Sequence, residues 1–183
     1  MKIMTNVEIN KSIHLSEHLT SSSVATLGHS NELDGSRLSP HFTLGEMCKT
    51  SAKTADGNIP SHIHIENLKR LCGWLEMLRS EWNKRYGEGD DPIVINSGYR
   101  SEAVNKAVGG VSGSNHLTGC AADIRVAGIE QLVRYATILL DISDESQEDF
   151  DELLLERSPR GGYWLHFAVR PSGNRRKVRL IQT

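Results

Sequence analysis

The sequence predicts an α+β fold in which a small antiparallel sheet is flanked by helices. Apolar residues recur at alternating intervals of three and four across 61–85, which is the period of an amphipathic helix. Residues 93–95 are all β-branched, as expected of a buried strand. Within 163–170, the apolar residues Leu165, Phe167 and Val169 alternate with Trp164, His166 and Ala168, which is the period of a strand. His116, Asp123 and His166 in addition predict a zinc site at one face of the sheet.

The chain has 183 residues, which we interpret as a folded domain over 39–183 preceded by an extension over 1–38. The extension is rich in Ser, Thr, Asn and His, and we expect it to be partly ordered. A net charge of -2 and a pI of about 6.4 give no reason to expect a nucleic-acid partner. No apolar run is long enough to span a membrane, and we expect a monomer.

The folded part is expected to open with a short helical turn. Thr43 can cap this turn, and Glu46 completes a capping box three residues later. Pro60 precedes the longest predicted helix, and the Gly- and Asp-rich segment 87–92 ends it. The apolar stripe of that helix comprises Leu68, Leu71, Leu75, Leu78 and Trp82.

The middle of the chain is predicted to contain two strands and one short helix. A buried strand over 93–95 is followed by a tight turn, after which Ser101 caps a helix that ends at Gly109. A Gly- and Ser-rich loop over 111–119 then leads into a strand over 121–126.

The C-terminal part is predicted to hold a helix and a hairpin. Apolar positions at helical spacing indicate a helix over 128–141, and the acidic segment 144–149 is expected to be a solvated loop. Two strands over 150–156 and 163–170 follow. The basic run over 175–180 is typical of a solvated edge strand.

His116, Asp123 and His166 form a candidate zinc set. The His–Asp spacing is weak evidence alone, but the small residues between the two let the backbone pack closely beneath a metal. In the strand predicted over 163–170, His166 shares a face with Trp164, while the neighbouring side chains are apolar. Three ligands leave an open position on zinc, and zinc-bound water ionises near neutral pH. The set therefore indicates a metallohydrolase.

Two further residues are candidates for catalysis. Arg100 can hold a substrate carboxylate or stabilise an oxyanion, and the alternative is an arginine in a surface salt bridge. Glu156 ends an apolar strand and is the candidate general base. Asp151 and Glu152 are the alternative carboxylates for that role.

The three cysteines, Cys48, Cys72 and Cys120, are an odd and scattered set. This argues against a disulfide framework and fits a reducing compartment. Cys72 lies on the apolar stripe of the long helix. Cys120 is either a small core residue or, as the alternative, a thiolate ligand for zinc.

Several motifs, in order, resemble those of the M15 family of zinc D,D-peptidases. Residues 114–123 read Ser-x-His-x-x-Gly-x-Ala-x-Asp, with Ser-Gly-Tyr-Arg before them at 97–100 and Trp-x-His after them at 164–166. The resemblance runs from about 39 to 169. The family includes D-alanyl-D-alanine carboxypeptidases and phage endolysins, and its fold is shared with the Hedgehog N-terminal domain.

The resemblance implies Zn²⁺ as cofactor, with His116, Asp123 and His166 as ligands and Arg100 as the cation for substrate or transition state. Many family members carry the catalytic carboxylate three residues before the last histidine, where this chain has Tyr163. A branch with Trp-x-His uses the glutamate that ends the preceding strand, here Glu156. The candidate substrate-binding residues are Arg100, Tyr99, Ser114 and Trp164.

We therefore expect a zinc peptidase that cuts peptidoglycan stem peptides at a bond next to a D-amino acid, of the D-Ala-D-Ala carboxypeptidase or the endolysin type. The alternative is a non-catalytic zinc module that binds cell-wall peptides or a protein partner, and a displaced Glu156 would favour it. Four protein ligands normally close a structural zinc site, which disfavours that third possibility. Because no secretory signal is visible, we expect a protein made in the cytoplasm that acts on the cell wall if exported or released.

Overall fold

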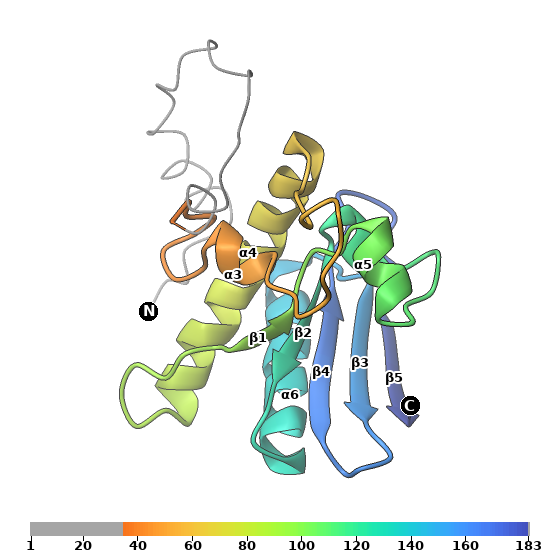
Figure 1. Ribbon diagram of the computed structural model, residues 1–183. Helices are drawn as coiled ribbons and strands as arrows, with labels where there is room; N and C mark the ends of the chain where they lie inside the picture. The colour runs from red at the N-terminus through yellow and green to blue at the C-terminus, as the bar shows by residue number, and fades with distance from the viewer. Residues whose placement is uncertain (1–34, 183) are drawn as a thin grey trace, which may run out of the picture.

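A computed structural model describes residues 35–182 as one five-stranded sheet with helices packed against it (Figure 1). Most of the extension predicted over 1–38 lies outside the described residues. The strands are β1 (Ile95–Ser97), β2 (Ala121–Arg125), β3 (Glu152–Arg157), β4 (Tyr163–Ala168) and β5 (Lys177–Gln182). The helices are α3 (Leu44–Met47), α4 (His62–Arg85), α5 (Glu102–Ala107), the 3₁₀ helix η2 (Asn115–Thr118) and α6 (Ile129–Ser146).

The strand order is β1-β2-β4-β3-β5, and neighbouring strands are antiparallel except for β3 and β5. The predicted α+β class is therefore confirmed, with one parallel pair that the sequence did not indicate. The predicted edge strand is β5, which lies at the end of the sheet beside β3 (Figure 1).

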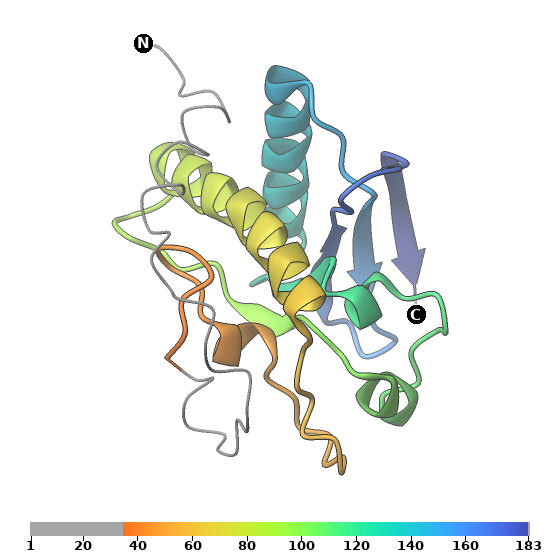
Figure 2. The same ribbon diagram turned by 90° about the horizontal axis from the view of Figure 1, so that it is seen from above.

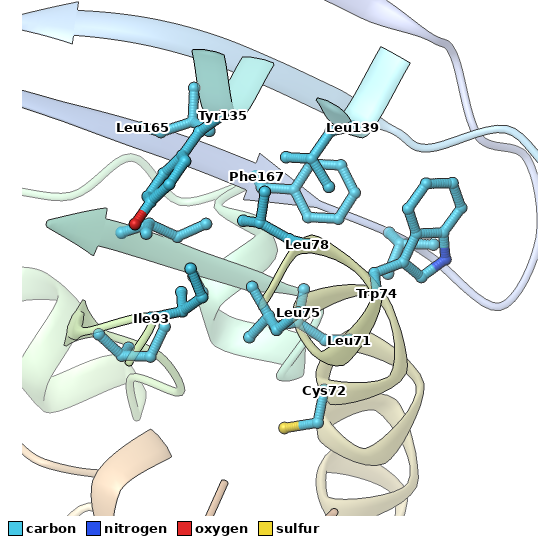
Figure 3. Close-up of a cluster of buried hydrophobic side chains, with 14 of the residues drawn as sticks. Leu71, Cys72, Trp74, Leu75, Leu78, Ile93, Tyr135, Leu139, Leu165 and Phe167 are labelled. Atoms are coloured by element: carbon cyan, nitrogen blue, oxygen red, sulfur yellow. The ribbon is translucent and has the colours of Figure 1, made fainter. Parts of the chain in front are cut away.

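The two long helices, α4 and α6, lie on the same face of the sheet (Figures 1 and 2). The predicted apolar stripe of α4 is buried there, because it packs against α6 and the strands (Figure 3). The residues that meet in this core include Leu71, Trp74, Leu75, Leu78, Tyr135, Leu139, Leu165 and Phe167. Between residues 35 and 182, no helix combines the length and the apolar character that crossing a bilayer requires.

The opposite face of the sheet carries the polar side chains of the strands. Leu165 and Phe167 of β4 are fully buried on the helix side, so the alternating His166 points to the other face. On β2, Ala122 and Ile124 are likewise buried, and Asp123 between them faces the same way as His166. The predicted alternation is confirmed, and it places the candidate ligands together.

The predicted strand over 93–95 is displaced toward its C-terminal end. β1 begins at Ile95, which pairs with Ile124, and it ends at Ser97, which pairs with Asp123 across an irregular register. Val94 lies outside the strand and is 37% exposed. Pairing with β2, which a run of β-branched residues does not reveal, therefore decides where this strand lies.

The acidic segment 144–149 was predicted as a loop, but α6 continues through its first three residues to Ser146. Arg176 forms ion pairs with Asp144 and with Asp149, the latter at 3.2 Å. A basic residue from the segment before β5 thus compensates for the acidic charge at the end of α6. Gln147 then ends the helix in the left-handed conformation.

The helix starts follow the predicted capping residues. The Thr43 hydroxyl accepts from the Glu46 amide at 3.2 Å at the start of α3, and the Ser101 hydroxyl accepts from the Val104 amide at 3.2 Å at the start of α5. At the start of α4, the Ser61 amide donates to the His64 ring at 3.3 Å.

Candidate metal centre

Three side chains from separate elements converge on the polar face of the sheet. Asp123 Oδ1 lies 3.2 Å from Nε2 of His116 and 2.9 Å from Nδ1 of His166. One ligand atom from each residue lies within 4.8 Å of the others. Ligands about 2.0–2.1 Å from a tetrahedral zinc are roughly 3.3 Å apart, so these separations fit a single ion between the three side chains. Two imidazoles and one carboxylate also suit zinc chemically.

His116 is held in one orientation by its surroundings. The segment predicted as a loop contains η2, which begins after Ser114 and ends at Gly119, a residue with φ of 71°. The imidazole is buried, and its Nδ1 lies 2.6 Å from the carbonyl oxygen of Gly98. Donation from Nδ1 to that carbonyl leaves the lone pair of Nε2 for a metal.

Gly98 is required by the close approach of another backbone segment. A Cβ at this position would lie 2.3 Å from the carbonyl oxygen of Met47. That same oxygen accepts a hydrogen bond from the Tyr99 amide at 2.7 Å. The absent side chain thus lets α3 lie against the segment whose carbonyl orients His116.

Both carboxylate oxygens of Asp123 make polar contacts. Oδ1 faces the two histidines, and Oδ2 accepts from Nη2 of Arg100 at 2.5 Å. Burial alone would raise the pKa of Asp123, but His116 and His166 hold that pKa well below its usual range. The carboxylate is therefore charged, as a metal ligand must be.

Arg100 lies in the site, and the surface salt bridge considered as an alternative is not what the structure shows. Its Nε donates to Ser97 Oγ at 2.8 Å, and its Nη2 donates to Asp123. Among residues 35–182, its Nη1 group has no hydrogen-bond partner. Arg100 therefore orients a ligand and keeps donors for another group.

His166 presents one ring nitrogen to Asp123 and the other to a second carboxylate. Its Nε2 lies 3.6 Å from Oε2 of Glu152. Burial alone would lower the pKa of His166, but the hydrogen bond to Asp123 and the neighbouring Glu152 carboxylate raise that pKa to about 9. In the metal-free protein the ring is protonated at neutral pH, so metal binding releases a proton.

The three candidate carboxylates for the general base lie in different surroundings. Asp151 is fully buried and forms ion pairs with Arg170 and Arg175. The adjacent His166 ring, with a further contribution from Lys177, holds the pKa of Glu152 well below its usual range. Both alternatives are thus fully engaged in other interactions.

Glu156 differs from these two carboxylates. It is half-buried on the polar face of β3, diagonally across from His166, and burial raises its pKa. Within the part of the chain that the structure describes, it forms no hydrogen bond or ion pair. Of the three carboxylates, Glu156 alone combines this position with an unengaged side chain.

The other predicted substrate-binding residues are Tyr99, Ser114 and Trp164, and their surroundings differ. The Tyr99 ring is 5% exposed and packs against His64, with ring centroids 4.9 Å apart, so its evident role is packing. The Ser114 hydroxyl accepts from the amide of His116 at 3.3 Å. Trp164 is half-buried on the polar face, opposite Glu156 in the register of β3 and β4.

Cys120 is not a member of the ligand cluster, so its alternative assignment as a thiolate ligand is not supported. Its side chain is 2% exposed, and its sulfur lies 3.8 Å from the carbonyl oxygen of Thr118. Burial raises its pKa, which favours the neutral thiol over the thiolate that a metal requires. The reading of Cys120 as a small core residue fits this placement.

Sequence reasoning missed the cations behind the site. The basic run was predicted as a solvated strand, but Lys177 and Arg175 lie 2.7 Å and 3.0 Å from Oε1 of Glu152. The available signal was the adjacent pair Asp151 and Glu152, two acids at the start of an apolar strand that need buried partners.

Comparison with known proteins gives two matches. A family model described as Peptidase M15 matches residues 40–141, which include Arg100, His116 and Asp123 but not Glu156 or His166. A zinc D-Ala-D-Ala carboxypeptidase from Streptomyces albus G is 31% identical over 84 residues. This alignment covers 46% of the present chain and 31% of that protein, so the chain spans about a third of the relative's length.

We predict that the protein binds one zinc ion, and that His116→Ala or His166→Ala weakens binding by at least about 100-fold, because each removes a direct ligand. The measurement is competition with a chromophoric chelator, with elemental analysis for stoichiometry. Cys120→Ser is the matched control and should bind like the wild type. Loss of zinc from Cys120→Ser together with retention by His166→Ala would contradict the ligand set.

Proposed function

This chain belongs to the peptidase M15 family, and on that basis we propose that it is a zinc-dependent peptidase that hydrolyses peptidoglycan stem peptides at a bond next to a D-amino acid. The observation that carries the proposal is the convergence of His116, Asp123 and His166, with ligand atoms at the spacing of one zinc ion. The carboxypeptidase relative supports release of a terminal D-alanine, and cleavage within the stem peptide is the other form of the same function.

The three ligands would hold zinc through Nε2 of His116, Oδ1 of Asp123 and Nδ1 of His166. Bound zinc would supply a Lewis acid for the scissile carbonyl and would lower the pKa of a water molecule toward neutrality. The protein contributes the charge of Asp123 and the fixed ring orientation of His116. Three ligands also leave a position for substrate or water, which a structural site lacks.

Glu156 is the proposed general base. Its carboxylate would accept a proton from the attacking water and then donate that proton to the leaving amine. A raised pKa brings a glutamate closer to the pKa of an efficient base near neutral pH, and burial shifts Glu156 in that direction. Because no described residue forms a hydrogen bond or ion pair with Glu156, its oxygens are available to water.

Arg100 is the proposed cation for substrate. While Nη2 stays on Asp123, the Nη1 group can donate to a substrate carboxylate or to the oxyanion that develops during attack. We propose that Trp164, which lies opposite Glu156 on the polar face, supplies an apolar wall against which a D-amino acid side chain packs.

The function is tested with a synthetic stem peptide that ends in D-Ala-D-Ala. We expect release of D-alanine by the zinc-loaded protein, loss of release after chelation, and recovery when zinc is restored. A peptide that ends in L-Ala-L-Ala controls for general peptidase activity and should not be cut. Binding of stem peptides by zinc-loaded protein, with no cleavage of any bond, would instead favour the non-catalytic module.

We predict that Glu156→Gln lowers kcat by about 10²–10⁴, because the amide cannot accept the proton. Zinc affinity should stay within about twofold, since Glu156 contacts no ligand directly. Glu145→Gln, which alters an exposed acid on α6, is the matched control and should be fully active. Full activity of Glu156→Gln would remove Glu156 as the base.

Arg100→Ala tests whether the guanidinium does more than hold Asp123. We predict weaker zinc binding and, at saturating zinc, a further loss of kcat/KM by about 10²–10³. Arg125→Ala is the control, because the guanidinium of this exposed arginine of β2 donates to Asn96 at 3.3 Å and, among the described residues, forms no ion pair. Complete recovery of Arg100→Ala at saturating zinc would restrict its role to orienting Asp123.

A further inference from the structure

The polar face of the sheet places Glu152 beside the metal ligand His166. In the register of β3 and β4, Glu152 lies opposite Ala168 and Leu154 lies opposite His166, so Glu152 is diagonal to the histidine. With Nδ1 of His166 directed at Asp123, Nε2 carries the hydrogen and lies 3.6 Å from Oε2 of Glu152. A carboxylate at this point can fix both the rotation and the tautomer of the ring.

Glu152 is itself fixed by three donor side chains. Its Oε1 lies 2.7 Å from Lys177 Nζ and 3.0 Å from Arg175 Nη2. Its Oε2 accepts from the Asn115 side-chain amide at 3.0 Å. The Glu152 side chain is only 14% exposed, so these contacts, rather than solvent, compensate for its charge.

Asn115 connects this carboxylate to the other histidine. It directly precedes His116 in η2, and its side-chain amide donates to both Asp151 and Glu152, at 2.8 Å and 3.0 Å. The side-chain Oδ1 of Asn115 accepts from Nε of Arg170 at 2.9 Å, which fixes the orientation of the amide. One network of hydrogen bonds and ion pairs therefore connects the two elements that carry the histidines.

The cations of this network come from the C-terminal end of the chain. β5 runs parallel to β3 with Lys177 opposite Glu152, and it forms the edge of the sheet (Figure 1). Arg175 lies just before β5, and its guanidinium also contacts Asp151 through two hydrogen bonds of 2.7 Å. None of these cations lies within the family match over 40–141.

We propose that Glu152 is a positioning residue for His166, and that Lys177 of β5 holds Glu152 in place, so that the C-terminal edge strand forms part of the metal centre. Glu152 acts on the metal only through the histidine ring. The proposal rests on the zinc site of the proposed function and is independent of whether a peptide bond is cut.

The test measures the zinc affinity of the full chain by chelator competition. We expect Glu152→Ala and Glu152→Gln to raise the Kd for zinc by about 10–100-fold, and Lys177→Met to raise it by a smaller factor. Arg179→Met is the matched control, because Arg179 is an exposed cation of the same strand with no ion pair among the described residues. Its Kd should equal that of the wild type.

A second measurement reports on the ring itself. In the zinc-loaded wild type, long-range ¹H–¹⁵N NMR spectra should show the His166 hydrogen on Nε2, protected from exchange, and Glu152→Ala should lose that protection. Urea unfolding with zinc present identifies variants that fail to fold. If Glu152→Ala does not fold, Lys177→Met and Glu152→Gln carry the test. An unchanged Kd and an unchanged Nε2 signal in folded Glu152 variants would overturn the proposal, whereas a wild type that binds no zinc would overturn the metal site itself.

Discussion

The antiparallel pairing of β2 with β4 places Asp123 directly opposite His166, and the rest of the site depends on this register. Side chains alternate along a strand, so a slip of one residue would turn His166 toward the helices and Phe167 toward the polar face. Burial of Leu165 and Phe167 beneath the helices opposes any such slip. The same alternation of side chains along β2 and β4 therefore directs apolar residues into the core on one face of the sheet and the candidate ligands to the other face.

Four carboxylates lie close to the site, and their surroundings assign them different tasks. Asp123 faces both histidines, Asp151 is buried among arginines, and Glu152 is surrounded by donors. Glu156 has no hydrogen-bond or ion-pair partner between residues 35 and 182, and its pKa is shifted in the opposite direction from those of Asp123 and Glu152. Four residues along β3 separate a fixed anion from the proposed proton acceptor, because Lys177 and Arg175 form ion pairs with Glu152 and not with Glu156.

The sequence supported the fold class, the long helix and the ligand set, because each leaves a periodic or local pattern. The stripe over 61–85 and the alternation around His166 are two such patterns. The beginning of β1 and the partners of Glu152 were not predictable in this way. Both depend on how strands far apart in the chain are paired, and the parallel register that brings Lys177 to Glu152 leaves no mark in either segment alone. The basic run looked solvated because its acidic partners lie some twenty-five residues earlier, as in the contact of Lys177 with Glu152.

The three proposed ligands come from η2, β2 and β4, which meet only in the folded chain. An unfolded chain offers no such cluster, so zinc binds the native state preferentially and shifts the folding equilibrium toward it. At a free zinc concentration 100 times the dissociation constant, this linkage contributes about 2.7 kcal/mol, a large part of the stability of an ordinary domain. Availability of the ion would thus govern how long the molecule survives proteolysis as well as whether it can act.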